Sequence, residues 1–168
     1  GKMNWHIAQL NVGRLVAPTD SPEVAAFMAA LDRVNALADR SPGFVWRLKS
    51  DSGNATDIQV GADPQFLVNM SVWQSVETLF EFVYRSAHTS AMVRRREWFE
   101  KPTEPFMVLW WVPAGHIPNV VEALARLDHL RANGPTPHAF SFKEKYPAPD
   151  TGGAPEDMKP EPYCVGWK

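Results

Sequence analysis

Two segments of this chain alternate between residue types in the same way. Residues 5–12 read WHIAQLNV and residues 66–73 read FLVNMSVW. Successive side chains of a β-strand point to opposite faces, so this alternation predicts two strands, each with one dry wall and one mixed wall. The dry wall comprises Ala8, Leu10, Val12, Phe66, Val68, Met70 and Val72. The mixed wall comprises Trp5, Ile7, Gln9, Asn11, Leu67, Asn69, Ser71 and Trp73.

The mixed wall needs a partner. Its apolar residues would make an unusually large exposed patch if water covered them. Its amides would each cost a few kcal/mol, about 1–3, if they were buried without hydrogen bonds. Either a second copy packs sheet to sheet against this wall, or the wall lines a pocket with convergent polar groups, and both can hold together.

The remaining segments supply helices and further strands. Ser21 is a good N-cap before Pro22, and apolar residues at helical spacing predict a helix over residues 22–40. Further strands are expected at 44–49, 106–112 and 139–146, and a turn-rich loop at 51–65. Further helices are expected within 75–100, with a break near Ser86, and from Ile117 to Asn133-Gly134.

The element order is β-α-β-β-α-β followed by α-β. It predicts an α+β fold, a ferredoxin-like antiparallel sheet with helices on one face. We expect one domain over residues 3–146 and a Pro-rich C-terminal tail over 147–168, docked through Tyr163 and Trp167.

Charge and composition exclude several classes of protein. The 168 residues suit one domain, and the net charge of -2 argues against nucleic acid as a partner. Cys164 is the only cysteine, so an intramolecular disulfide is impossible. No apolar run approaches the roughly 20 residues of a membrane span, and the N-terminus lacks a signal-peptide layout. We therefore expect a cytoplasmic protein with no membrane partner.

Longer motifs resemble known proteins. Residues 69–88, NMSVWQSVETLFEFVYRSAH, resemble the strand-to-helix motif of the dimeric α/β-barrel superfamily, the antibiotic-biosynthesis-monooxygenase-like proteins. Residues 86–101, SAHTSAMVRRREWFEK, and residues 109–142, from LWWVPAGH to PHAFSF, resemble one uncharacterised bacterial family of that superfamily. The resemblance covers most of residues 5–146. It implies a homodimeric α/β barrel, and the superfamily includes cofactor-free oxygenases, haem proteins, isomerases and cyclases.

The resemblance also singles out His88, which matches the helix histidine of the superfamily. In haem-degrading relatives this residue is the axial ligand, and Asn11 occupies a place comparable to an asparagine that lies over the haem. Phe82 stands near the position of the relatives' distal tryptophan, which is a departure from the haem pattern. Two other roles stay open for His88: a locally hydrogen-bonded structural residue, or an acid/base in the pocket, because imidazole titrates near neutrality.

Helical spacing extends the candidate site. Tyr84 and Met92 lie four residues from His88 and share its helix face, and Arg96 at i+8 could reach the same side to bind an anion. Arg94 to Arg96 are otherwise expected to stay outside the pocket. The other expected substrate-binding residues are Gln9, Trp46, Asn69, Ser71, Trp73, Trp111 and His116.

Other site classes have no support in the sequence. No histidine pair has zinc-site spacing, and there is no phosphate-binding glycine loop or nucleophile elbow, so we expect no metal. The interpretation is a small-molecule enzyme acting on an aromatic or polyketide-like substrate by cofactor-independent oxygenation or proton transfer. His88 would be the acid/base, with Asn11 and Tyr84 beside it. The alternatives are a haem protein with His88 as axial ligand and a non-catalytic binding module.

Overall fold

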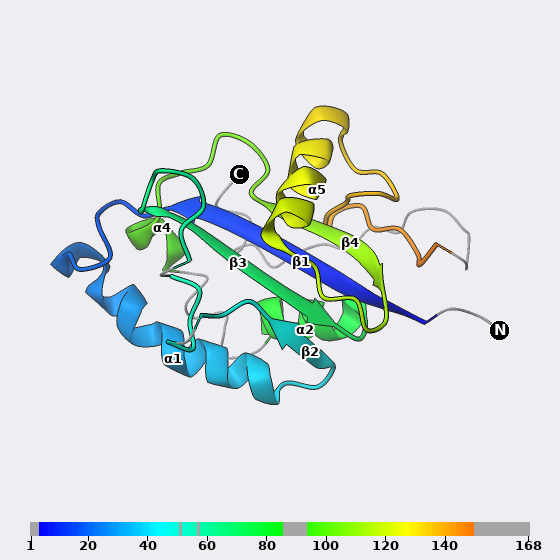
Figure 1. Ribbon diagram of the computed structural model, residues 1–168, viewed down its shortest axis with the longest axis horizontal. Coiled ribbons are helices and arrows are strands. Elements are labelled where there is room, and N and C mark those ends of the chain that lie inside the picture. The colour runs from blue at the N-terminus through cyan, green and yellow to red at the C-terminus, as the bar shows by residue number, and fades with distance from the viewer. Residues whose placement is uncertain (1–3, 51, 57, 86–93, 150–168) are drawn as a thin grey trace.

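Four strands form one antiparallel sheet in the order β2-β3-β1-β4 (Figure 1). They are β1 (Trp5–Arg14), β2 (Phe44–Arg47), β3 (Phe66–Trp73) and β4 (Met107–Pro113). The computed structural model describes residues 4–50, 52–56, 58–85 and 94–149. The predicted α+β class, the antiparallel sheet and the ferredoxin-like order are confirmed. The tail beyond residue 149, with Tyr163 and Trp167, lies outside the described residues.

The register of the two central strands joins their walls. Gln9 pairs with Ser71 and Asn11 pairs with Asn69, so the polar residues of the two mixed walls lie side by side. Leu10 pairs with Met70 on the opposite face, which continues the dry wall across both strands. The alternation read from the sequence therefore becomes two chemically distinct faces of one sheet.

Helices cover both faces of this sheet. The helices α1 (Ala25–Arg40) and α2 (Val76–Arg85) lie on the side of the mixed wall, and α5 (Val120–Asn133) lies on the side of the dry wall (Figure 1). A short 3-10 turn (Pro22–Val24) precedes α1, and a short helix α4 (Arg95–Trp98) precedes β4. The distribution of helices differs from the expected one-sided arrangement, because α5 adds a layer to the dry wall.

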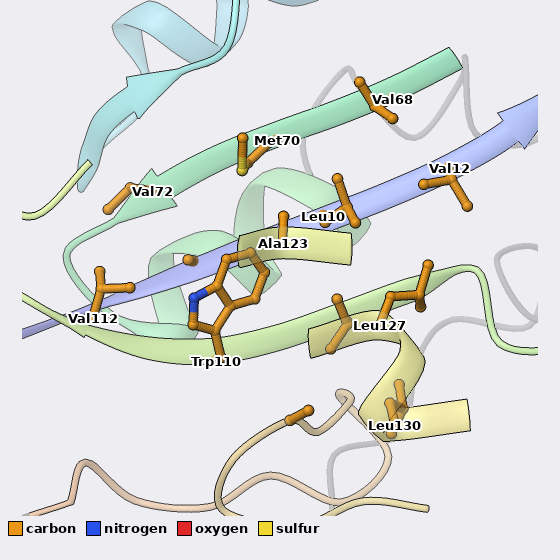
Figure 2. Packing of buried hydrophobic residues seen from close by; sticks show 13 residues of the cluster. Leu10, Val12, Val68, Met70, Val72, Trp110, Val112, Ala123, Leu127 and Leu130 are labelled. Atoms are coloured by element: carbon orange, nitrogen blue, oxygen red, sulfur yellow. The ribbon is translucent and has the colours of Figure 1, made fainter. Parts of the chain in front are cut away.

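The core between α5 and the dry wall is closed within a single chain. Leu10, Met70 and Trp110 of the sheet pack with Ala123 and Leu127 of α5, and all five are almost fully buried (Figure 2). The sheet-to-sheet contact with a second copy was expected on the mixed wall, and α1 and α2 cover that wall. The homodimer therefore stays a prediction, and it would need a surface other than a bare sheet face.

Two expected elements differ from the structure. The helix expected from Ile117 begins at Val120, after Asn119, whose side chain accepts a hydrogen bond from Glu122 N (2.8 Å). The strand expected at 139–146 forms only isolated pairings, of which the main one joins Phe140 to Leu109. The chain turns within Ser141–Glu144, so it cannot follow β4 further.

Within the described residues, no helix has the length and apolar character that crossing a bilayer requires.

Candidate functional site

A pocket of about 180 Å³ lies between the mixed wall of the sheet and the helices α1, α2 and α4. Most of its lining is apolar, as is usual for small-molecule sites. The aromatic part of the lining consists of Phe27, Trp73, Phe82, Tyr84, Trp98, Phe99 and Phe106. The main aliphatic part consists of Leu31, Val34, Leu67, Leu79, Val83 and Met107.

Four polar side chains of the mixed wall form a connected strip on the floor of this pocket. We call Gln9, Asn11, Asn69 and Ser71 the amide strip. Gln9 Nε2 donates to Asn69 Oδ1 (2.8 Å) and to Ser71 Oγ (2.9 Å). Asn11 Nδ2 donates to Gln9 Oε1 and to Asn69 Oδ1, each at 3.1 Å. The strip therefore satisfies most of its own polar atoms, which permits Gln9 to be only 3% exposed.

Some hydrogen-bonding capacity of the strip remains open. In the part of the chain that the structure describes, Asn11 Oδ1 has no donor and Asn69 Nδ2 has no acceptor. Ser71 Oγ accepts from Gln9 and from Trp73 Nε1 (2.9 Å), so both its lone pairs are engaged and its hydrogen is left to donate. The strip can thus offer an acceptor and at least two kinds of donor to a ligand.

Trp73 connects the strip to the aromatic wall of the pocket. It is fully buried, stacks on Phe82 with ring centroids 5.0 Å apart, and meets Phe44 edge to face at 5.5 Å. Its indole N–H orients the Ser71 hydroxyl, as described above. Trp73 therefore fixes both a ring wall and the direction of a polar group, an arrangement suited to a flat molecule with an oxygen substituent.

Arg95 lies in the pocket lining, which the sequence did not predict. Its guanidinium carbon is 4.3 Å from the centroid of Phe99 and 4.9 Å from that of Phe106, and Nη2 donates to Val12 O (3.0 Å). Burial lowers the pKa of Arg95 to about 10, so the side chain is still charged at neutral pH. The prediction that Arg94 to Arg96 all stay outside the pocket is wrong for Arg95. Arg95 and Arg96 belong to the short helix α4, and the docking of this helix on the sheet sets Arg95 over Gly13.

The structure places only part of the predicted site in this pocket. Gln9, Asn11, Asn69, Ser71, Trp73 and Tyr84 line it. His88 and Met92 lie outside the described residues. The other predicted residues, Trp46, Arg96, Trp111 and His116, do not line it.

These absences from the lining have local causes. A register shift between Phe44 and Trp46 sets Trp46 opposite Val72, and Trp46 packs with the dry-wall core. Trp111 donates from Nε1 to Tyr146 O (2.9 Å). His116 Nε2 lies 2.8 Å from Glu122 Oε1 at the start of α5, and Arg96 is exposed.

Gly13 continues the mixed wall beyond Asn11 and lies under Arg95. A Cβ at this position would be 2.5 Å from Phe99 Cδ1 and 2.8 Å from Arg95 Nη2. We expect Gly13→Ala to lower the free energy of unfolding by about 1–2 kcal/mol, because both side chains must move. Urea denaturation would measure this loss.

The double variant Gly13→Ala, Phe99→Leu is the control for this explanation. Trimming the Phe99 ring removes the closest contact. The stability losses of the two single variants, Gly13→Ala and Phe99→Leu, should therefore sum to more than the loss in the double variant. Additive losses would contradict the steric explanation.

Comparisons with known proteins identify one matching family and several similar solved structures. Residues 6–155 match the family model described as "Domain of unknown function (DUF3291)". No curated protein matches the chain. Among solved structures, "Putative antibiotic biosynthesis monooxygenase from Nitrosomonas europaea" is 14% identical, with 71% of this chain and 98% of that chain covered, at a TM-score of 0.45.

A second solved structure is similar to the same degree. It is a "putative Antibiotic biosynthesis monooxygenase" from Chloroflexus aurantiacus J-10-fl, 14% identical over 68% of this chain and 98% of that chain, at a TM-score of 0.43. The expected match to an uncharacterised family is confirmed by the family model, and membership of the dimeric α/β-barrel superfamily stays a prediction.

Proposed function

The chain belongs to the DUF3291 family, and on that premise we propose that it is a small-molecule enzyme acting on an aromatic or polyketide-like substrate. One observation carries the proposal. The amide strip keeps unfilled donors and an acceptor inside a pocket whose other walls are mostly aromatic and aliphatic. Asn69 is exposed and Asn11 is half-buried, so a ligand can reach their open groups, whereas Ser71 is buried and keeps a hydroxyl hydrogen to donate.

The proposed chemistry begins with loss of a proton from a phenol or an activated C–H of the substrate. The donors at Asn69 and Ser71 would stabilise the negative charge that develops on the substrate oxygen. His88 is the proposed base that accepts the proton, a role that remains a prediction. The resulting anion can rearrange, or it can react with dioxygen without a cofactor.

Haem is the alternative that the resemblance implies. The cavity of about 180 Å³ is smaller than the roughly 300–1,000 Å³ typical of sites for drug-sized ligands. Among the described lining residues none is a histidine or cysteine, so the described lining supplies no axial ligand of these types. The proposed chemistry therefore includes no step that uses haem. A visible spectrum of the protein mixed with haemin tests this alternative directly.

Paired alanine replacements on α1 test whether the pocket binds small molecules. Ala30 lines the pocket, whereas its neighbour Ala29 is exposed and does not. We expect 6-hydroxy-2-naphthoate to quench the fluorescence of Trp73 and Trp98 saturably in the unmodified protein and in Ala29→Trp. Ala30→Trp should abolish this binding by filling the pocket. Equal binding by both variants would refute the proposal.

Catalysis and binding alone give different results in a second assay. Oxygen uptake or a change in substrate mass on incubation with phenolic naphthalenes favours the enzyme, and binding without turnover favours the binding module. His88→Ala is expected to keep the melting temperature and to lose turnover, because it removes the proposed base. The homodimer and the cytoplasmic location remain predictions. Light scattering, which measures the mass of the protein in solution, tests the homodimer.

A further inference from the structure

We propose that Arg95 is a specificity-determining residue that selects substrates carrying an anionic oxygen, a carboxylate or phenolate, at the end of the pocket over Gly13. This inference rests on the proposed function and names the class of substrate. It assigns the substrate two polar ends: a hydrogen-bonding oxygen over the amide strip and an anion beside Arg95.

The first step of the argument is position. Gln9, Asn11 and Gly13 alternate along β1 and so share the mixed wall. At about 3.4 Å per residue, Gly13 lies about 7 Å beyond Asn11 and about 14 Å beyond Gln9 along the strand. A ligand of one or two rings spans the shorter separation, from the Asn11–Asn69 pair to Gly13. Its far end would then meet the guanidinium, whose Nη2 is close above Gly13.

The second step is the way in which the guanidinium is held. Phe99 and Phe106 flank it at 4.3 and 4.9 Å, and Nη2 contacts Val12 O at 3.0 Å. The missing side chain at Gly13 makes room for both Arg95 and Phe99. A cation positioned in this way is pre-organised, and its planar fork matches a carboxylate.

The third step is the charge of the pocket. Among the described lining residues two are arginines and none is Asp or Glu. Arg47 is held by Asp39, with its Nε 2.8 Å from Oδ1, and it also donates to Gly53 O. Arg95 donates to the Val12 carbonyl, and its burial lowers its pKa to about 10. An anionic ligand would offset the desolvation of this charge.

The test uses a pair of ligands that differ only in charge. The probes are 6-hydroxy-2-naphthoate and its neutral carboxamide, titrated by tryptophan fluorescence or calorimetry. In Arg95→Gln we expect the Kd for the naphthoate to rise about 10- to 100-fold, because the variant loses one charge-assisted hydrogen bond to the carboxylate. The Kd for the carboxamide should change by less than about threefold.

Two further variants complete the test. Arg96→Gln is the matched control, because Arg96 is an exposed neighbour that does not line the pocket, and it should leave both affinities unchanged. Arg95→Lys keeps the charge but loses the fork, so it should recover part of the preference for the naphthoate. This variant also guards against a folding defect in Arg95→Gln.

Each outcome separates the two proposals. Equal losses for both probes in Arg95→Gln would indicate a structural role and overturn the inference, as would no loss at all. If Ala30→Trp blocks both probes and Arg95→Gln leaves their affinity ratio unchanged, only the inference fails. If the unmodified protein binds neither probe, or if Ala30→Trp does not block them, the proposed function fails as well.

Discussion

Replacing Trp110 with alanine is expected to lower the free energy of unfolding by about 3–5 kcal/mol, as for other large aromatic truncations in cores. Trp110 is fully buried in the dry-wall core, beside Ala123 and Leu127 of α5 (Figure 2). Its Nε1 also donates to Glu122 Oε2 (3.1 Å), which ties the first turn of α5 to β4. The variant therefore loses both packing volume and an anchor of the helix. Urea denaturation followed by circular dichroism would measure the change.

The chain contains its own control for this prediction. Trp111 is the same residue type at the next position, but it faces the other side of the sheet and is only half-buried. Trp111→Ala should cost about 1–2 kcal/mol, because less apolar area leaves water on folding. If the two variants lose the same free energy of unfolding, the dry-wall core under α5 does not contribute more stability than the core on the opposite face of the sheet.

Replacing Gln9 with leucine is expected to weaken both the fold and the pocket. Gln9 makes three hydrogen bonds, one to each of the other members of the amide strip. Their loss should lower the free energy of unfolding by about 2–3 kcal/mol, at about 1 kcal/mol for each bond. Asn69 and Ser71 then lose the partner that orients them. We expect about a tenfold rise in the Kd of the neutral naphthamide, equivalent to about 1.4 kcal/mol.

Gln74→Leu is the control for this prediction, because Gln74 is exposed just beyond β3 and does not line the pocket. It should change the unfolding free energy by less than about 0.5 kcal/mol, as is usual at the surface, and should leave the affinity for the probe unchanged. Unaltered binding by Gln9→Leu would show that the amide strip does not contact the ligand.

Much of this pocket could be inferred from the sequence because alternation is a local property of a strand. Gln9, Asn11, Asn69, Ser71 and Trp73 were expected on one wall, and that wall lines the pocket. The requirement that these polar groups find partners also follows from local chemistry. The sequence alone therefore determined the α+β class, the two faces of the sheet and the polar floor of the candidate site.

Other features depend on contacts between distant segments, and only the tertiary structure decided them. An amphipathic helix such as α5 can cover either face of a sheet, and its own pattern does not say which. A register shift next to Trp46 turned that residue away from the pocket. Arg95 reaches Val12 across 83 positions of sequence, because Gly13 leaves space above β1. Spacing along one helix carries no information about such a contact, since it is set by how α4 docks on the sheet.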